Sequence, residues 1–230
     1  MDKIQIIEKL FLHIVCYSYL LIPLSFFLSK NRFKERIPFF IAIYGVLFFC
    51  LLMAYGDVPK NYKKAYQFIY TYTEYLFLTF LIWPTITAKK FKRVVVILSI
   101  SFLAFQIFYF FNTNNTRLDS VPIGIETILM LVYIVYFFLQ FSKNTGATYI
   151  YDHYLFWLSV GILVYLGGSF FFFILINHLS NEQINTFGNI TYLTEVFKNI
   201  LFAIGIFVYS KNKTQRKDTN QRNVPNLDMI

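Results

Sequence analysis

The sequence predicts an all-α membrane protein that folds as a bundle of seven transmembrane helices. Apolar residues make up 57% of the chain and charged residues only 14%, whereas soluble domains carry about 25% charged residues. The charges gather between seven apolar runs of 18 to 25 residues. A helix needs about 20 residues to cross the hydrocarbon of a bilayer. Because backbone groups must be hydrogen-bonded inside lipid, each run should be helical.

The runs follow one another with short linkers, so consecutive helices should be antiparallel neighbours. The first run is too long for a signal-peptide core and lacks a small-x-small cleavage site, so we expect it to remain as a span. The predicted spans are 4–28, 37–55, 66–86, 94–111, 121–141, 154–176 and 187–209. Residues 210–230 are rich in Lys, Asn, Gln and Asp. They should form a disordered, basic tail.

The distribution of Lys and Arg predicts the orientation of the bundle. The linkers after the odd-numbered spans and the tail hold 14 of these residues, and the opposite side holds 6. The positive-inside rule therefore places the N-terminus outside and the C-terminus in the cytoplasm. We interpret the net charge of +9 as a sign of contact with anionic lipids at the cytoplasmic face rather than of nucleic-acid binding.

Charged and amide side chains interrupt several apolar runs, and they fall at similar depths. With a rise of 1.5 Å per residue, Glu74 and Glu195 lie roughly 12 Å and Glu126 about 7–8 Å below the outer ends of their spans. Lys198 lies near the midplane, and Gln106 reaches the same outer layer from the fourth span. Charges at such depths cost roughly 2.5–3.5 kcal/mol each on insertion scales, so they are rarely without a role.

Helical spacing adds neighbours to these groups and defines the candidate ligand-binding site. Residues at i, i+3, i+4 and i+7 share one face of a helix, so polar side chains form stripes in the third and seventh spans and meet a glycine-containing stripe in the sixth. The candidate binding residues are Glu74, Glu126, Glu195, Lys198, Asn199, Tyr70, Thr71, Gln106, Tyr165 and Tyr192.

Two interpretations of this polar layer remain open. In the structural one, Lys198 pairs with Glu195, three residues earlier on the same helix. Glu74 and Glu126 would then accept hydrogen bonds from Tyr or Thr hydroxyls, or stay protonated. In the functional one, the three carboxylates line a cavity that opens outward, because three acids share the layer with only one cation.

The sequence indicates no catalytic constellation. His13, His153 and His178 fall at different levels of the predicted bundle, so they cannot meet at one zinc ion. A glycine-rich phosphate loop and a Gly-x-Ser-x-Gly motif are both absent from the sequence. Cys16 and Cys50 lie inside apolar runs and should be packing residues. We expect a protein that is not an enzyme and holds no cofactor; whether it binds a metal ion stays open.

A mid-membrane lysine in the last of seven helices resembles the arrangement of microbial rhodopsins. The segment 72–79 also resembles the third helix of that family, with Glu74 at the counterion position. The resemblance implies retinal on Lys198. The sequence departs from the family because Glu195 precedes Lys198 by three residues rather than four. Thr71 and Phe80 also stand where that family usually has Arg and Pro.

A second resemblance covers most of the chain. Glu74 in an aromatic third span, 125–127, 156–168 and 199–206 are similar to an uncharacterised family of small bacterial seven-span inner-membrane proteins. This resemblance implies the same topology and a multi-pass location in a bacterial inner membrane. Asn199 fits the family pattern, whereas Lys198 does not.

These observations favour a membrane-embedded sensor or ligand-binding protein. Its outward-facing acidic site would bind a small cationic or hydrogen-bonding ligand or a metal ion. The basic cytoplasmic face would relay to a cytoplasmic or membrane protein partner. The alternative is a small transporter or proton-coupled carrier, for which buried glutamates are the usual relay. The inner halves of the second, fourth and sixth spans are almost wholly apolar, which favours the sensor.

Overall fold

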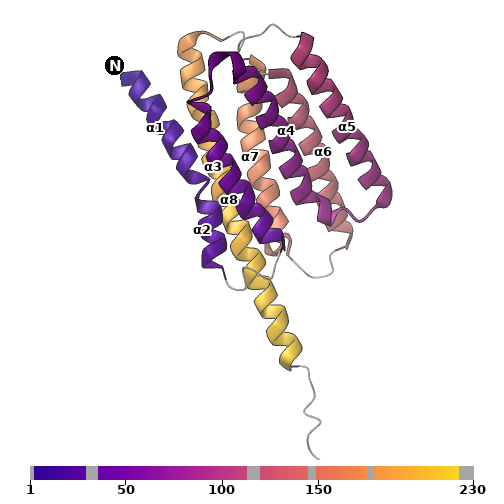
Figure 1. Cartoon of the computed structure of the whole chain (residues 1–230). Coiled ribbons are helices and arrows are strands. Elements are labelled where there is room, and N and C mark those ends of the chain that lie inside the picture. Colours follow the sequence, from indigo (N-terminus) through magenta and orange to yellow (C-terminus); the bar gives the residue numbers. More distant parts are fainter. Residues whose placement is uncertain (1–2, 30–35, 113–119, 145–148, 176–178, 223–230) are drawn as a thin grey trace, which may run out of the picture.

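The computed structural model describes residues 3–29, 36–112, 120–144, 149–175 and 179–222, and all regular structure in these ranges is helical (Figure 1). The α-helices are α1 (Lys3–Ser18), α2 (Leu21–Leu28), α3 (Arg36–Tyr55), α4 (Lys63–Ile82), α5 (Lys89–Asn112), α6 (Ser120–Asn144), α7 (Tyr154–Leu175) and α8 (Asn181–Arg222). Short 3₁₀ helices cover Lys60–Tyr62, Trp83–Thr85 and Ile150–Asp152. The predicted all-α class is therefore confirmed.

Five helical segments of the described chain are long and apolar enough to cross a membrane, and they indicate a membrane protein. These are Leu10–Leu28, Arg36–Tyr55, Lys89–Asn112, Val121–Lys143 and Phe187–Lys211. The predicted third span falls on α4, whose Lys, Tyr and Thr residues lower its hydropathy. The sixth falls on α7, of which Tyr154–Phe170 is apolar but shorter.

The helices form a bundle in which α8 is central. It packs most extensively against α7 and also contacts α1, α2 and α3, while α4 joins α3, α5 and α6 to the bundle. Successive long helices alternate in direction (Figure 1). The interior is mainly aliphatic and aromatic, and its fully buried side chains include Ile41, Phe48, Leu78, Ile134, Leu158, Ile162, Phe202 and Ile206.

The first predicted span is a broken helix rather than a continuous one. Pro23 lies at the start of α2, and a proline lacks the N–H donor and its ring collides with the carbonyl four residues earlier, here that of Tyr19. A β-carbon at Gly45 of α3 would lie 2.8 Å from that carbonyl oxygen and 2.9 Å from the Pro23 ring. Gly45 therefore lets α3 approach the break closely, and the break fixes where the Tyr19 side chain enters the bundle.

The C-terminal end of α8 also differs from the prediction. The sequence predicted a disordered tail from residue 210, whereas α8 continues to Arg222; residues 223–230 lie outside the described part of the chain. Lys, Gln and Arg are good helix formers, and neither Gly nor Pro occurs between Gly205 and Pro225, so the helix can propagate from its packed part. This last part of α8 leaves the bundle at the end opposite the start of α1 (Figure 1).

Candidate functional site

Lys198 of α8 lies fully buried in the bundle, where groups from three other helical regions meet its ammonium. Its Nζ donates to Glu74 Oε1 of α4 at 3.0 Å and to the Tyr19 hydroxyl at the α1–α2 break at 3.2 Å. The ring of Tyr165 from α7 lies 3.8 Å from Nζ. An ammonium over an aromatic face at this distance adds a cation–π attraction to the ion pair.

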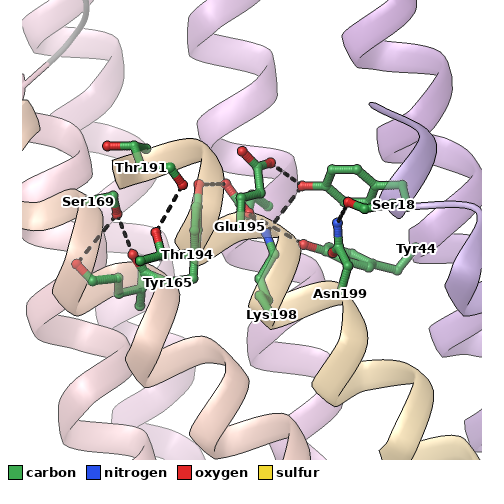
Figure 2. A network of polar contacts seen from close by, with 12 residues as sticks. Ser18, Tyr44, Tyr165, Ser169, Thr191, Thr194, Glu195, Lys198 and Asn199 are labelled. Atoms are coloured by element: carbon green, nitrogen blue, oxygen red, sulfur yellow. Dashed lines mark hydrogen bonds and ion pairs between the residues drawn. The ribbon is translucent and has the colours of Figure 1, made fainter. Parts of the chain in front are cut away.

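The two carboxylates beside Lys198 are also hydrogen-bonded. Glu74 accepts from Tyr44 at 3.4 Å and from Tyr165 at 3.3 Å. Glu195 accepts from the Tyr19 hydroxyl at 2.5 Å. Tyr19 therefore links the two charged groups of α8, because it accepts from Lys198 and donates to Glu195. We call Lys198, Glu74, Glu195, Tyr19, Tyr44 and Tyr165 the Lys198 network; Figure 2 shows most of its bonds.

The predicted pairing of Lys198 with Glu195 is wrong. The ion pair that the structure forms runs between helices, from Lys198 to Glu74, and Glu195 is reached through Tyr19. Spacing of i and i+3 puts two side chains on one face but does not choose between partners on one helix and partners on the next. Here Tyr19, at the helix break, bonds to both Lys198 and Glu195, and α4 presents Glu74 to the lysine.

Other predicted residues lie around the network. Asn199 donates to Ser18 Oγ at 2.7 Å and is fully buried, but its Oδ1 has no partner in the described structure. Thr71 is buried one turn before Glu74. Tyr70 is partly exposed and faces Tyr19. Tyr192 is partly buried and packs against the hydrophobic core.

The contact between α7 and α8 positions the network because it is unusually close. A β-carbon at Gly161 would lie 3.3 Å from the backbone oxygen of Lys198, and one at Gly168 would collide with the Thr194 side chain. Small residues at helix interfaces in membranes allow such approach. The glycines of α7 thus bring the Tyr165 ring onto Lys198.

Glu126 of α6 and Gln106 of α5 are two further buried polar residues, and they are called the second polar region below. Each side chain is 2% exposed. In the described residues, Glu126 Oε1 and Gln106 Oε1 have no hydrogen-bond partner. The structure therefore brings most of the predicted candidates together around Lys198. Glu126 lies within electrostatic reach of Glu74 and Lys198, whereas its Oε1 and that of Gln106 take no part in the hydrogen bonds of the Lys198 network.

Sequence reasoning missed Ser18, Tyr19 and Tyr44, which complete the Lys198 network and the Asn199 contact. A signal for the tyrosines is present, because each lies in a mainly apolar predicted span and a buried phenol needs a hydrogen-bond partner. Choosing Tyr19 and Tyr44 among the chain's 18 tyrosines requires knowledge of which helices meet.

The arrangement is suited to holding a cation in a protein-enclosed acidic environment. Glu74, Glu126, Glu195 and Lys198 are between 0 and 7% exposed. A buried carboxylate is costly unless a cation and hydrogen bonds compensate it, and Lys198 supplies one positive charge for the layer. In the part of the chain that the structure describes, no three His, Cys, Asp or Glu side chains are grouped to hold a metal ion.

Comparisons with known proteins add no relative to this geometry. Neither protein-family models nor curated proteins nor solved structures gave a match to the chain.

Proposed function

We propose that the protein is a seven-span sensor of a bacterial inner membrane, with its N-terminus outside and no catalytic activity. It binds a small organic cation at the Lys198 network and relays this event to a cytoplasmic partner. One observation carries the proposal: α8 holds Glu195, Lys198 and Asn199 in the bundle and continues as one helix to Arg222, beyond the other helices (Figure 1). A helix that reaches from the site to the basic end of the bundle is suited to transmit a change at the site.

The cation class follows from what Lys198 itself contacts. Its ammonium contacts a carboxylate and the face of a tyrosine ring. Glu74 Oε1 lies 3.0 Å and the Tyr165 ring 3.8 Å from Nζ. Aromatic faces beside a carboxylate also recognise ligand ammonium groups. A ligand of this class would compete with Lys198 for Glu74. Because Lys198 belongs to α8, its displacement would change how α8 is held.

A competition experiment tests the proposal. We expect methylammonium or tetramethylammonium to raise the melting temperature of Lys198→Ala in nanodiscs, because the ligand replaces the missing charge. Wild type should respond more weakly, and Lys198→Ala with Glu74→Gln should not respond. Lys89→Ala, at an exposed lysine of α5, is the matched control and should behave as wild type. Equal responses from all four proteins would contradict a cation site at the Lys198 network.

The relay has its own measurement. Spin labels at Thr87, between α4 and α5, and at Lys211, in the last part of α8, report the position of the α8 end relative to the bundle. We expect the distance distribution between the labels to change when an amine that stabilises the protein is added. If the distance distribution stays unchanged while the amine is bound, the protein binds the amine but does not relay this event through α8.

A transporter is the second candidate, and a group of hydroxyls favours it. Tyr75 of α4 bonds to Ser99 of α5 at 2.8 Å and to Tyr133 of α6 at 3.0 Å, so polar groups continue past the level of Glu126. Uptake of a labelled amine, or proton flux, by purified protein in liposomes would support this class if Glu74→Gln abolished it.

The position of Lys198 also gives the retinal hypothesis a test. A Schiff-base lysine needs a carboxylate counterion, and Glu74 on α4 lies 3.0 Å from Nζ. Addition of retinal to the purified protein should produce visible absorbance that Lys198→Met abolishes. Lack of any absorbance would remove this hypothesis and leave the organic-cation sensor unaffected.

A further inference from the structure

The helices α4, α5 and α6 are held in a common register by one tyrosine. Tyr75 of α4 shares its hydroxyl with Ser99 of α5 at 2.8 Å and with Tyr133 of α6 at 3.0 Å. All three pairs of these helices pack against each other. Ser99 and Tyr133 therefore face the same point at the same level of the bundle.

Two turns further along each helix, the same faces carry Gln106 and Glu126. Gln106 follows Ser99 by seven residues, and Glu126 precedes Tyr133 by seven. Because α5 and α6 run in opposite directions, both steps lead toward the same end of the bundle, by about 10.5 Å. Seven residues are close to two full helical turns, so Gln106 lies on the same helix face as Ser99, and Glu126 lies on the same face as Tyr133. The register thus places Gln106 and Glu126 opposite each other.

Both side chains present an acceptor that nothing in the described structure satisfies. Glu126 Oε1 and Gln106 Oε1 have no hydrogen-bond partner, and both residues are 2% exposed. Two facing oxygens cannot bond to each other without a hydrogen between them. An isolated carboxylate in such a place is also costly, and such groups usually become neutral. One added proton satisfies both requirements.

The cation that acts on Glu126 is already hydrogen-bonded to other groups. Glu74 of α4 and Lys198 of α8 act on it electrostatically, and Tyr165 of α7 is the nearby phenol. Lys198 donates to Glu74 and Tyr19 instead. On α5, the inward-facing polar group at this level is the neutral Gln106.

We propose that Glu126 is a proton-binding site, in which the carboxylic acid O–H formed at Oε1 donates to Gln106 Oε1. The proton comes from hydronium in the solvent, which is left as water, and binding the proton changes the carboxyl from a charge of −1 to neutral. Release of the proton adds a further negative charge that acts on Glu74. The occupancy of Glu126 therefore modulates the electrostatics of the Lys198 network. The site does not depend on the proposed sensor function, since it requires no organic ligand.

Infrared spectroscopy of the full-length protein in nanodiscs tests this site directly. A protonated carboxyl has a carbonyl band separate from those of carboxylates and amides, and deuterium exchange shifts it. We expect wild type to show this band at neutral pH and Glu126→Gln to lack it. The matched variants Glu74→Gln and Glu195→Gln should keep it. In Gln106→Leu the band should persist at a shifted frequency, because the acid loses its acceptor.

Wild type alone keeps the proposal testable if a variant fails to fold. Its band should disappear reversibly as the pH is raised. A wild-type spectrum without the band, or an unchanged band in folded Glu126→Gln, would overturn the proposal. So would a melting temperature that rises with added sodium chloride in wild type but not in Glu126→Gln, because the site would then hold a metal cation.

Discussion

The two polar regions of the bundle are both buried, but their hydrogen bonds are completed to different degrees. Around Lys198, the ammonium is met by Glu74, Tyr19 and the Tyr165 ring. In the second region, the Oε1 acceptors of Glu126 and Gln106 have no partner within the described chain. A satisfied buried network rigidifies the elements that it joins, whereas an unpaired buried polar group is costly, so binding a proton that pairs it is favourable. The first region should therefore contribute stability, and the second should respond to conditions.

The largest effect should come from breaking the satisfied region at its buried lysine. Lys198→Met leaves Glu74 without its cation, and removal of one member of a buried ion pair costs about 3–5 kcal/mol. Adding Glu74→Gln should restore much of this loss, and adding Glu195→Gln should restore less, because the direct ion pair is with Glu74 at 3.0 Å. Thermal unfolding in detergent measures all three proteins.

Lys89→Met is the control for this series, because it removes an exposed lysine. It should leave the melting temperature almost unchanged. Better restoration by Glu195→Gln than by Glu74→Gln would instead assign the lysine to the carboxylate on its own helix.

A second way to sharpen the comparison is to loosen the α7–α8 contact that supports the Lys198 network. Gly168→Ala places a methyl group against Thr194, and such overpacking costs about 1–3 kcal/mol. Gly167→Ala is the matched control, since a β-carbon added there would meet no other side chain or neighbouring helix within 4 Å and alanine is the better helix former. The melting temperature should fall for Gly168→Ala and stay or rise for Gly167→Ala.

If Thr194 is the obstacle, Thr194→Ala combined with Gly168→Ala should recover part of the stability. Equal loss in the two single glycine variants would show that close packing at Gly168 is not what holds α7 on α8.

The unsatisfied region yields a smaller effect with a distinctive pattern. If Glu126 donates to Gln106, then Gln106→Leu removes the acceptor of a buried hydrogen bond, which costs about 1 kcal/mol. Replacing both residues with Leu should be nearly neutral, because no polar group is then left unpaired. Thermal unfolding of the two single variants and the double variant gives the coupling energy. A single Gln106→Leu that is more stable than wild type would show that the amide accepts nothing.

The sequence predicted the polar layer and the helices better than it predicted their connections. Glu74, Glu195 and Lys198 could be found because charges in apolar runs are rare, and the stripes of α4 and α8 follow from helical spacing. The partner of Lys198 could not, since several carboxylates share its level and only packing selects Glu74. Pro23 was a visible signal for the break in the first span. The helical end of α8 was less visible, because its polar composition is also typical of disordered tails.

The smallest effect concerns two buried serines on α7, of which one hydroxyl is hydrogen-bonded and the other is not. Ser159 and Ser169 are both fully buried. Ser169 Oγ donates to the Tyr165 backbone oxygen at 2.7 Å, whereas Ser159 Oγ has no partner in the described residues. An intrahelical bond of this kind is worth on the order of 1 kcal/mol or less, and an unpaired buried hydroxyl carries an uncompensated desolvation cost.

Alanine should therefore be less favourable for stability at Ser169 than at Ser159. Ser169→Ala should slightly lower the free energy of unfolding, and Ser159→Ala should leave it unchanged or raise it. Either change should be at most about 1 kcal/mol, and thermal unfolding measures it. The two substitutions remove the same atom from the same helix, so helix propensity and lost volume cancel in the comparison. A clear loss for Ser159→Ala would mean that its hydroxyl bonds to a buried water, and α7 would then carry a hydrated polar group two residues from Gly161, which packs against Lys198.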